Sequence, residues 1–169
     1  TTAKLIWPIE AKPKILAITT TGRIALVKWE FAGQQPGKLE KFLPGGLEGE
    51  TIVNLIRLPE GKSFSLTLLS SDGRLKRLPM EDIIELSGRA ATILKLKDGI
   101  KLKSAMLSDD NGDIVIISSY GRILKLKVSE ETMPLMGKLA QGTIIMRTFP
   151  GEEIIGGVSS YTNKDSLVV

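Results

Sequence analysis

Cysteine and histidine are both absent from the sequence. Without cysteine the chain can form no disulfide, no thiolate zinc site and no cysteine nucleophile. Without histidine it lacks the commonest general base and the commonest metal ligand. No apolar run approaches the ~18 residues that cross a membrane. These absences argue against a membrane protein and against enzymes that depend on either side chain.

The start of the chain, TTAKLIWPIE, also lacks an initiator methionine and the anatomy of a signal peptide. We therefore expect a piece of a longer cytoplasmic protein. What the chain does contain is 42% hydrophobic and 25% charged residues over 169 positions, which is enough for one packed domain. Its 23 Lys and Arg against 19 Asp and Glu give a net charge of +4, which is compatible with a polyanionic partner.

One pattern occurs three times along the chain, as ILAITTTGRIALVKW, LTLLSSDGRLKRLPM and IVIISSYGRILKLKV. The glycines of its Gly-Arg pairs are Gly22, Gly73 and Gly121. A second landmark keeps nearly the same step along the chain, with glycines at Gly49, Gly99 and Gly151. A period of ~50 residues held by two landmarks indicates repeated supersecondary units.

Each repeat predicts four short strands. A β-branched or aliphatic run precedes the Gly-Arg glycine and a partly alternating run follows it, so the two form a hairpin whose turn needs the positive φ of glycine. A polar loop, a run such as TILKLK or TIIMRTF, and a run such as TIVNLI or IKLKSAM complete the unit. Only residues 79–86, PMEDIIEL, indicate a turn or two of helix. Four strands are typical of one propeller blade, so we predict an all-β, propeller-like fold.

The predicted blades of this single domain span residues 15–63, 64–112 and 113–164. Residues 1–14 read as the end of a preceding blade, with a strand at 3–9, and residues 165–169 as the start of a next one. Three blades are too few to close a ring. Two arrangements remain open: the end strands pair as a fourth, incomplete blade, or the chain is an arc of a larger wheel.

The hydroxyl pair, the Gly-Arg and the aliphatic-basic strand at this period resemble the C-terminal domain of the A subunits of bacterial type IIA topoisomerases, the family of DNA gyrase and topoisomerase IV. The segment GKLAQGTIIMR at 137–147 is similar to the family's loop of a basic residue, Ala-x-Gly and an aliphatic run, and SGRAATILKLK at 87–97 is a looser version. The resemblance covers residues from about 15 to 169. It implies a β-pinwheel, a wheel in which blades exchange strands, with about three complete repeats and partial blades at both ends.

The resemblance further implies a non-catalytic domain that binds and bends duplex DNA within an ATP-dependent type II topoisomerase. The implied partners are double-stranded DNA, the ATPase subunit, and the rest of the A subunit. No cofactor is implied for this domain, and ATP and magnesium are implied only for the holoenzyme. The gyrase-type Gln-Arg-Arg-Gly-Gly-Lys-Gly box is missing, because PGGLEGE at 44–50 has the glycines without the arginines. The parent is therefore open between gyrase and topoisomerase IV.

Wrapping DNA without reading its sequence needs phosphate contacts spread along a curved surface. Cations on the same edge of every blade would provide them, and we expect their side chains at the surface. The candidates on the hairpins are Arg23, Lys28, Arg74, Lys76, Arg77, Arg122, Lys125 and Lys127, and those in loops are Arg89, Lys95, Lys97, Lys138 and Arg147. The alternative is that single lysines only keep exposed strands soluble, and that the arginine after each glycine caps a neighbouring turn.

Tyr120 invites comparison with the tyrosine nucleophile of type II topoisomerases. The equivalent repeat positions hold Thr21 and Asp72, so the position is a turn rather than a catalytic site. A nucleophile would also need an activating base and an acidic metal site. We therefore expect no catalytic residue in this chain.

Three other features have structural interpretations. DDNGD at 109–113 begins like a calcium loop, but Ile114 and Tyr120 stand where Gly and Glu are needed, so Asn111-Gly112 is expected to be a turn. LPGGLEG at 43–49 lacks the Gly-Lys-Ser/Thr of a phosphate loop. Trp7 and Trp29 lie in strand-like runs and are expected in the core.

The main hypothesis is thus a DNA-binding and DNA-bending domain, and the rival is a propeller-like protein-interaction scaffold without nucleic-acid binding. A continuous band of cations along the rim favours the first hypothesis. An exposed apolar patch favours the second.

Overall fold

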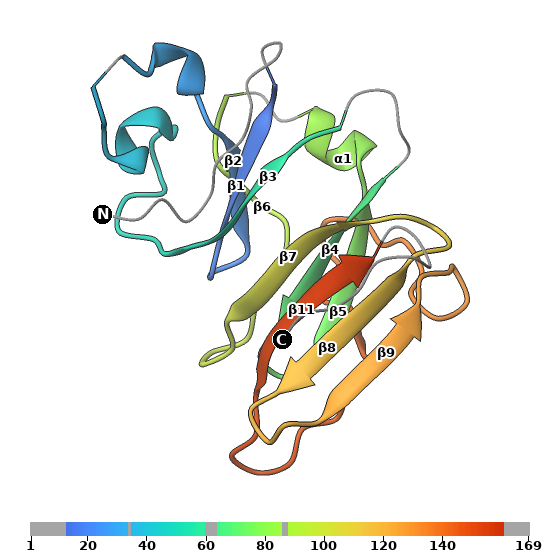
Figure 1. Cartoon of the computed structure of the whole chain (residues 1–169). Helices are drawn as coiled ribbons and strands as arrows, with labels where there is room; N and C mark the ends of the chain where they lie inside the picture. Colours follow the sequence, from blue (N-terminus) through green and yellow to red (C-terminus); the bar gives the residue numbers. More distant parts are fainter. Residues whose placement is uncertain (1–12, 34, 60–63, 86–87, 161–169) are drawn as a thin grey trace.

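Three antiparallel sheets, each built on one Gly-Arg hairpin, form the molecule (Figure 1). The computed structural model describes residues 13–33, 35–59, 64–85 and 88–160. The predicted end strands at 3–9 and 165–169, and Trp7, lie outside the described residues. The predicted all-β fold class is confirmed; the described residues contain one short α-helix, α1 (Glu81–Ile84), inside the segment expected to be helical.

The hairpins supply the two central strands of the first and second sheets and two of the three described strands of the third. They are β1 (Ile15–Thr19) with β2 (Arg23–Leu26), β4 (Ser65–Ser70) with β5 (Arg74–Pro79), and β8 (Asp113–Ser118) with β9 (Ile123–Lys127). The strands after the second landmark pair with the first strand of each hairpin; they are β3 (Ile52–Arg57), β7 (Leu102–Ser108) and β11 (Ile154–Ser160). The remaining elements are β6 (Ala91–Thr92), β10 (Thr143–Ile144) and the 3-10 helices η1 (Trp29–Phe31) and η2 (Leu39–Phe42).

The three hairpin turns are equivalent, as the repeat predicts. Gly22, Gly73 and Gly121 have φ values of 80°, 82° and 74°, which only glycine adopts without strain. Each glycine N–H donates to the carbonyl three residues earlier, at 3.1, 3.1 and 3.0 Å. A hydroxyl at that earlier position, on Thr19 or Ser118, accepts a hydrogen bond from the backbone N–H of the arginine that follows the glycine.

Two of the sheets are completed by a strand from the following repeat. β6 belongs to the second repeat but pairs with β2, where Arg23 lies opposite Thr92. β10 belongs to the third repeat but pairs with β5, where Arg74 lies opposite Ile144. The strand orders are therefore β3-β1-β2-β6 and β10-β5-β4-β7, and within the described residues the third sheet is β11-β8-β9. This is the strand exchange that the resemblance implies.

The exchanged segment crosses directly over the preceding hairpin turn. Ile93 and Leu94 both donate backbone hydrogen bonds to the Gly22 carbonyl, and residues 145 and 146 do the same to Gly73. A Cβ added at Gly22 would lie 2.3 Å from the Leu94 carbonyl oxygen. These turns therefore need glycine for close approach as well as for positive φ. The runs TILKLK and TIIMRTF contribute only short strands, because their remaining residues form this crossing.

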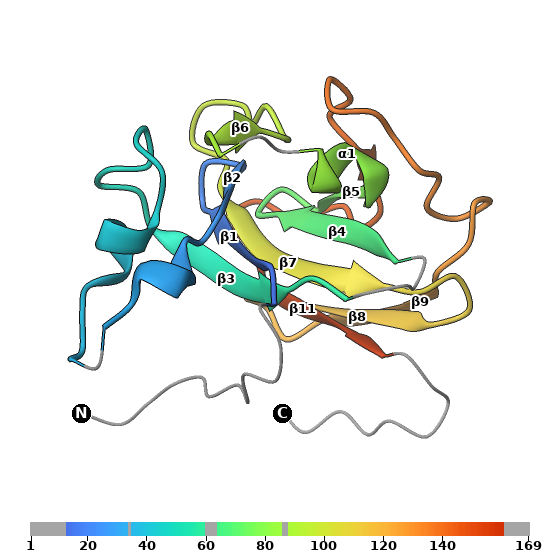
Figure 2. The same cartoon turned by 90° about the horizontal axis from the view of Figure 1, so that it is seen from above.

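The hydrophobic cores lie between successive sheets, and the second sheet is covered on both faces (Figure 2). Every residue of β4 is buried. One core joins the first and second sheets and includes Ile18, Ile24 and Leu68; the other joins the second and third and includes Leu69 and Ile114. Trp29, expected in a core strand, instead lies half-buried in η1, where its indole N–H donates to the Pro13 carbonyl.

Candidate nucleic-acid interface

The arginine that follows each turn glycine is held by its own protein. Arg23 forms an ion pair with Glu50 at 2.9 Å and also donates to the Gly46 carbonyl. Arg122 forms a two-point pair with Glu152, with N–O distances of 2.8 and 2.6 Å. Both glutamates directly follow the second-landmark glycine. These two arginines therefore link the hairpin turn to the loop that precedes β3 or β11, which agrees with the alternative that they cap a neighbouring turn.

In the second repeat the arginine after the turn glycine has different partners. Ile100 stands where Glu50 and Glu152 stand in the other repeats. Arg74 instead lies 3.4 Å from the Asp72 carboxylate in its own turn and donates to the Gly142 carbonyl of the next repeat. In the sequence, the signal that could have identified the other two ion pairs was the glutamate that directly follows the second-landmark glycine in the first and third repeats.

Glu152 is the most strongly held acid of this set. Its side chain is fully buried, and it accepts hydrogen bonds from Arg122, from the Ser118 hydroxyl at 2.5 Å and from the Phe149 backbone N–H. The hydrogen bond from Arg122, helped by the other two donors, overcomes the opposing effect of burial and lowers the pKa of Glu152 to about 2. The pair is therefore ionised throughout the physiological range.

Tyr120 is an exposed turn residue, as expected. Its hydroxyl donates to the Pro150 carbonyl at 2.9 Å, so its hydrogen bond goes to a backbone acceptor and not to a side-chain base. Beside it, the Arg122 guanidinium lies 4.4 Å from the centre of the Phe149 ring. The described residues contain no group of three acids that could hold a metal ion. Asn111, at φ 129°, and Gly112 form a turn, as predicted in place of a calcium loop.

The prediction that Lys76 and Arg77 lie at the surface is wrong, because both are only 1% exposed. They are on β5, which is covered by the first and third sheets and by the loop of the next repeat. Lys76 Nζ donates to the carbonyls of Ile93 and Lys138 at 2.7 and 2.8 Å, and so pins two exchange loops. Burial lowers the pKa of Lys76 to about 8, although the Asp82 charge acts in the opposite direction.

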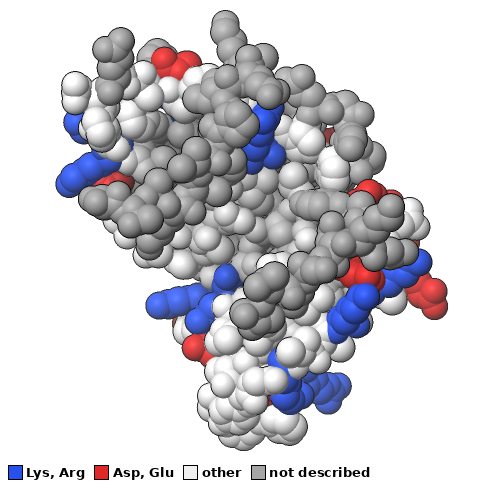
Figure 3. Space-filling view, viewed as in Figure 1, with Lys and Arg blue, Asp and Glu red and all other residues white. Residues whose placement is uncertain are grey.

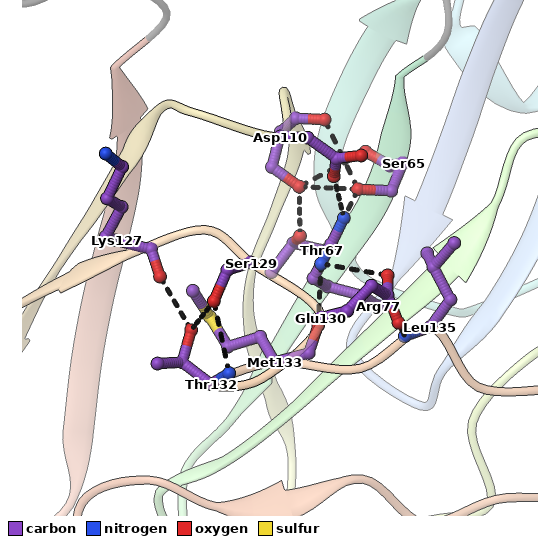
Figure 4. Close-up of polar contacts among 11 residues, drawn as sticks. Ser65, Thr67, Arg77, Asp110, Lys127, Ser129, Glu130, Thr132, Met133 and Leu135 are labelled. Atoms are coloured by element: carbon purple, nitrogen blue, oxygen red, sulfur yellow. Dashed lines mark hydrogen bonds and ion pairs between the residues drawn. The ribbon is translucent and has the colours of Figure 1, made fainter.

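Arg77 joins β5 to the loop that follows β9 (Figure 4). Its guanidinium donates to the Met133 carbonyl at 2.6 Å and to the Asp110 carboxylate at 2.5 Å, and Glu130 lies 3.5 Å away. Its Nε donates to Ser65, at the end of a buried chain of hydroxyls. Neither Lys76 nor Arg77 can reach a phosphate while it is buried in this way.

A basic hollow lies where the first and second blades meet. It has a volume of about 420 Å³ and lies between the β1–β2 turn and the loop that leads from β6 to β7. Its lining includes the cations Arg23, Lys95, Lys97 and Lys101 and a single acid, Asp98. The three lysines are exposed. The hollow brings together three of the predicted residues and adds Lys101, which the sequence reasoning missed.

The same loop in the third repeat is less basic. Alignment on Gly99 and Gly151 places Arg147, Phe149 and Glu153 at the positions of Lys95, Lys97 and Lys101. Glu153 also forms an ion pair with Lys103 at 2.9 Å. The junction between the second and third blades is therefore a weaker site for an anion than the junction between the first and second.

The remaining predicted cations do not join the hollow. Lys28 lies at the opposite end of the first hairpin, where its side chain reaches toward the segment that carries Gly88 and Arg89. Lys125 pairs with Asp113 at 2.9 Å. The others are exposed in separate places; they are Lys127, Lys138 and Arg147. On the face seen in Figure 3, the Lys and Arg side chains of the described residues lie in several separate groups and not in one continuous band.

Exposed apolar side chains concentrate on the third blade and its loops. They include Tyr120, Ile123, Phe149, Ile155 and Val158.

A search of the described residues for a helix with the length and hydropathy of a membrane span finds none.

The all-β architecture, the Gly-Arg hairpins and the strand exchange define a β-pinwheel. Solved structures agree: the C-terminal domain of DNA topoisomerase IV matches 89% of this chain with a TM-score of 0.74 at 16% sequence identity, and the DNA gyrase A C-terminal domain matches 89% with a TM-score of 0.71 at 17%. The chain covers 48% of each of those domains. It therefore has their fold over about half of their length.

Curated sequences point to the same kind of protein. The chain is 29% identical over 107 residues to the A subunit of DNA topoisomerase 4 from Synechocystis sp., covering 58% of this chain and 12% of that protein. It is 27% identical over 115 residues to the A subunit of DNA gyrase from Ureaplasma parvum, covering 68% of this chain and 14% of that protein. No protein-family model matches the chain. The resemblance to the C-terminal domain of type IIA topoisomerase A subunits is thus confirmed, and it extends to both gyrase and topoisomerase IV.

Proposed function

We propose that this chain is a non-catalytic DNA-binding and DNA-bending part of the A subunit of a type II topoisomerase. The observation that carries the proposal is the basic hollow at the junction of the first and second blades. Its lining holds four cations and one acid; Arg23 is paired with Glu50, and none of the three lysines forms an ion pair among the described residues. Phosphates can replace the counterions of such a surface without any base-specific contact.

The proposed contact is concentrated in the loops rather than spread along the hairpin strands. Lys95 and Lys97 directly follow the crossing over Gly22, and Lys101 precedes β7. The strand exchange holds this loop against the first blade, so its lysines sit at a fixed place on the blade edge. An ordered basic edge of this kind would hold a duplex at the junction of the first and second blades. The ATP-driven reaction itself would belong to other parts of the topoisomerase.

The test is a salt-dependent affinity measurement on a short duplex of unrelated sequence. If about five cations engage phosphates, log K should fall with log salt at a slope of roughly −4 to −5. Replacing Lys95, Lys97 and Lys101 together by Ala should flatten the slope by about 2 to 3, roughly one per lost contact. Folding should be unchanged, because all three side chains are exposed.

A matched control separates local contacts from net charge. Lys14, Lys38 and Lys41 are also exposed and lie away from the hollow, and their replacement by Ala removes the same three charges. This triple variant should bind with nearly the original slope. Equal losses in both triple variants would refute the assignment of the hollow. If neither the original chain nor the variants bind duplex DNA at low salt, the result would favour the alternative of a protein-interaction scaffold without nucleic-acid binding.

A further inference from the structure

The most exposed aromatic side chains that the structure describes both lie on the third blade. Tyr120 and Phe149 are each 57% exposed, whereas Trp29, Phe42 and Phe64 are half-buried. Large aromatic side chains that are scattered singly over a surface need no explanation, but a group of them marks an interaction site.

The two exposed rings come together from different segments. Tyr120 lies in the turn between β8 and β9, and Phe149 lies in the loop that leads to β11; turn and loop are neighbours in Figure 1. The Tyr120 hydroxyl donates to the carbonyl of Pro150, the residue next to Phe149, at 2.9 Å. Pro150 is itself exposed. These three side chains therefore form one uncharged surface with an aromatic ring on each side of the proline.

Phe149 is held firmly although it is exposed. Its backbone N–H donates to the buried Glu152 carboxylate at 2.8 Å, and its carbonyl accepts the Glu152 backbone N–H at 2.9 Å. The Arg122 guanidinium lies 4.4 Å from the ring centre and covers one face of the ring. More than half of the residue is nevertheless exposed, so the other face is open. A fixed, open ring loses little conformational entropy when a flat ligand stacks on it.

The exposure of these two positions is a property of the repeat. Thr21 occupies the position of Tyr120 in the first repeat, and Lys97 occupies the position of Phe149 in the second. Both Thr21 and Lys97 are exposed, although the first and second sheets each have four strands. The third repeat therefore places two rings on a part of the surface where the other repeats carry polar side chains.

The uncompensated charge beside the rings is positive. Glu152 is paired with Arg122, and Glu153 is paired with Lys103. Arg147 is exposed and forms no ion pair among the described residues. Its carbonyl accepts a hydrogen bond from the Arg122 guanidinium at 2.7 Å, so the two arginines are neighbours. Open aromatic rings beside a free guanidinium suit a ligand that has a flat ring and an anionic group.

We propose that Tyr120 and Phe149 bind unpaired bases of single-stranded DNA, and that Arg147 contacts an adjoining phosphate. Aromatic side chains stack on every kind of base, and each stacked base strengthens binding by a factor of about five or more. In a duplex both faces of a base are covered by its neighbours, so the rings select unpaired bases. The site is separate from the basic hollow and does not depend on the duplex contact proposed above.

The test compares two single strands of equal charge. One is an oligothymidylate about six nucleotides long, and the other is an abasic strand of the same length. At low salt the chain should bind the oligothymidylate at least about fivefold more tightly. Phe149→Leu, which keeps an exposed apolar side chain without a π face, should lose this preference, whereas Phe149→Trp should keep it. Leu139→Ala is the matched control, because it removes a 97% exposed side chain from another loop of the same repeat, and it should also keep the preference.

Four results would overturn the proposal. Equal affinity for the two strands would mean that phosphates alone are bound. A preference for bases that persists in both Phe149→Leu and Tyr120→Leu would place the stacking site elsewhere. Competition by free thymidine monophosphate at millimolar concentration would replace the strand by a mononucleotide as the ligand. Absence of binding to either strand would leave a protein partner for the two rings.

A spectroscopic measurement keeps the proposal testable if the variants disturb folding. In the original chain the ring-proton resonances of Tyr120 and Phe149 should shift when oligothymidylate is added and stay in place with the abasic strand; rings that do not respond to oligothymidylate would refute the site. The duplex assay separates this site from the hollow. Phe149→Leu should leave the salt slope on duplex DNA unchanged, and the variant with Lys95, Lys97 and Lys101 replaced by Ala should keep its preference for oligothymidylate over the abasic strand. Loss of that preference in the lysine variant would contradict a separate site.

Discussion

The buried lysine of the second blade should make the stability of this protein rise in alkaline solution. Lys76 is 1% exposed, and its ammonium group donates hydrogen bonds to two neutral carbonyls. Burial lowers its pKa from 10.5 to about 8. Between these values the unfolded chain binds more protons than the folded protein does, so the free energy of unfolding increases with pH.

The size of the effect follows from the pKa values. The charged form is about 3 kcal/mol less favourable in the folded protein than in the unfolded chain at pH 7, because each pKa unit corresponds to about 1.4 kcal/mol. At pH 10 most of that penalty is relieved, since the amine is neutral in the folded state and still has two hydrogens for the two carbonyls. The expected gain is about 2 kcal/mol, or about 1 M in the urea midpoint.

The assay is urea unfolding at pH 7 and pH 10 for three proteins. Lys76→Met should show no alkaline gain from this site, because it has no amine to titrate. Lys125→Met, at an exposed position on β9, should keep the full gain. If Lys76→Met gains as much between the two pH values as the original protein does, the argument from the buried ammonium is wrong.

Two further predictions concern the turns and their ion pairs. Gly73→Ala should cost at least about 3 kcal/mol of unfolding free energy, because the strain of a positive φ adds to a clash with the Met146 carbonyl. Gly49→Ala, at φ 75° with open space around it, should cost about 1 kcal/mol. Similar losses in both variants would contradict the crossing of residues 145 and 146 over the Gly73 turn. The Glu152 carboxylate, with a folded-state pKa of about 2 against 4.5, should stabilise the protein fully above pH 4.5 and progressively less toward pH 2. Acid titration of stability should therefore be flatter in Glu152→Gln, and identical acid profiles would count against this ion pair.

The regular spacing of the Gly-Arg motifs was the strongest predictor of the fold. The spacing of Gly22, Gly73 and Gly121 identified three equivalent turns, and the runs around them identified the hairpin strands. Which sheet each later run joins could not be read from periodicity, because TILKLK and TIIMRTF look like ordinary strands of their own repeats. Their exchange is a matter of topology, which local sequence does not encode.

The candidate site was harder to predict for a related reason. In RLKRLP on β5 the two leucines are three residues apart and therefore lie on opposite faces, one in each core, while Lys76 and Arg77 reach carbonyls of distant loops. In ILKLK on β9 leucine and lysine alternate and the lysines are exposed, because no described segment covers that side of the strand. Lysines on equivalent hairpin strands thus end in opposite environments, and the segments that cover each strand decide between them.

The exchange of strands also sets the order in which a ribosome could deliver a finished blade. β2 cannot pair with β6 until Thr92, the partner of Arg23, has been synthesised. In the same way β5 cannot pair with β10 until Ile144, the partner of Arg74, has been synthesised. At elongation rates of about 5 to 20 residues per second, a nascent hairpin keeps an unpaired edge for several seconds or more. During that time β2 or β5 is open to any extended segment nearby, including one on a neighbouring nascent chain. Faster translation of the loop before each crossing should therefore reduce misassembly between chains.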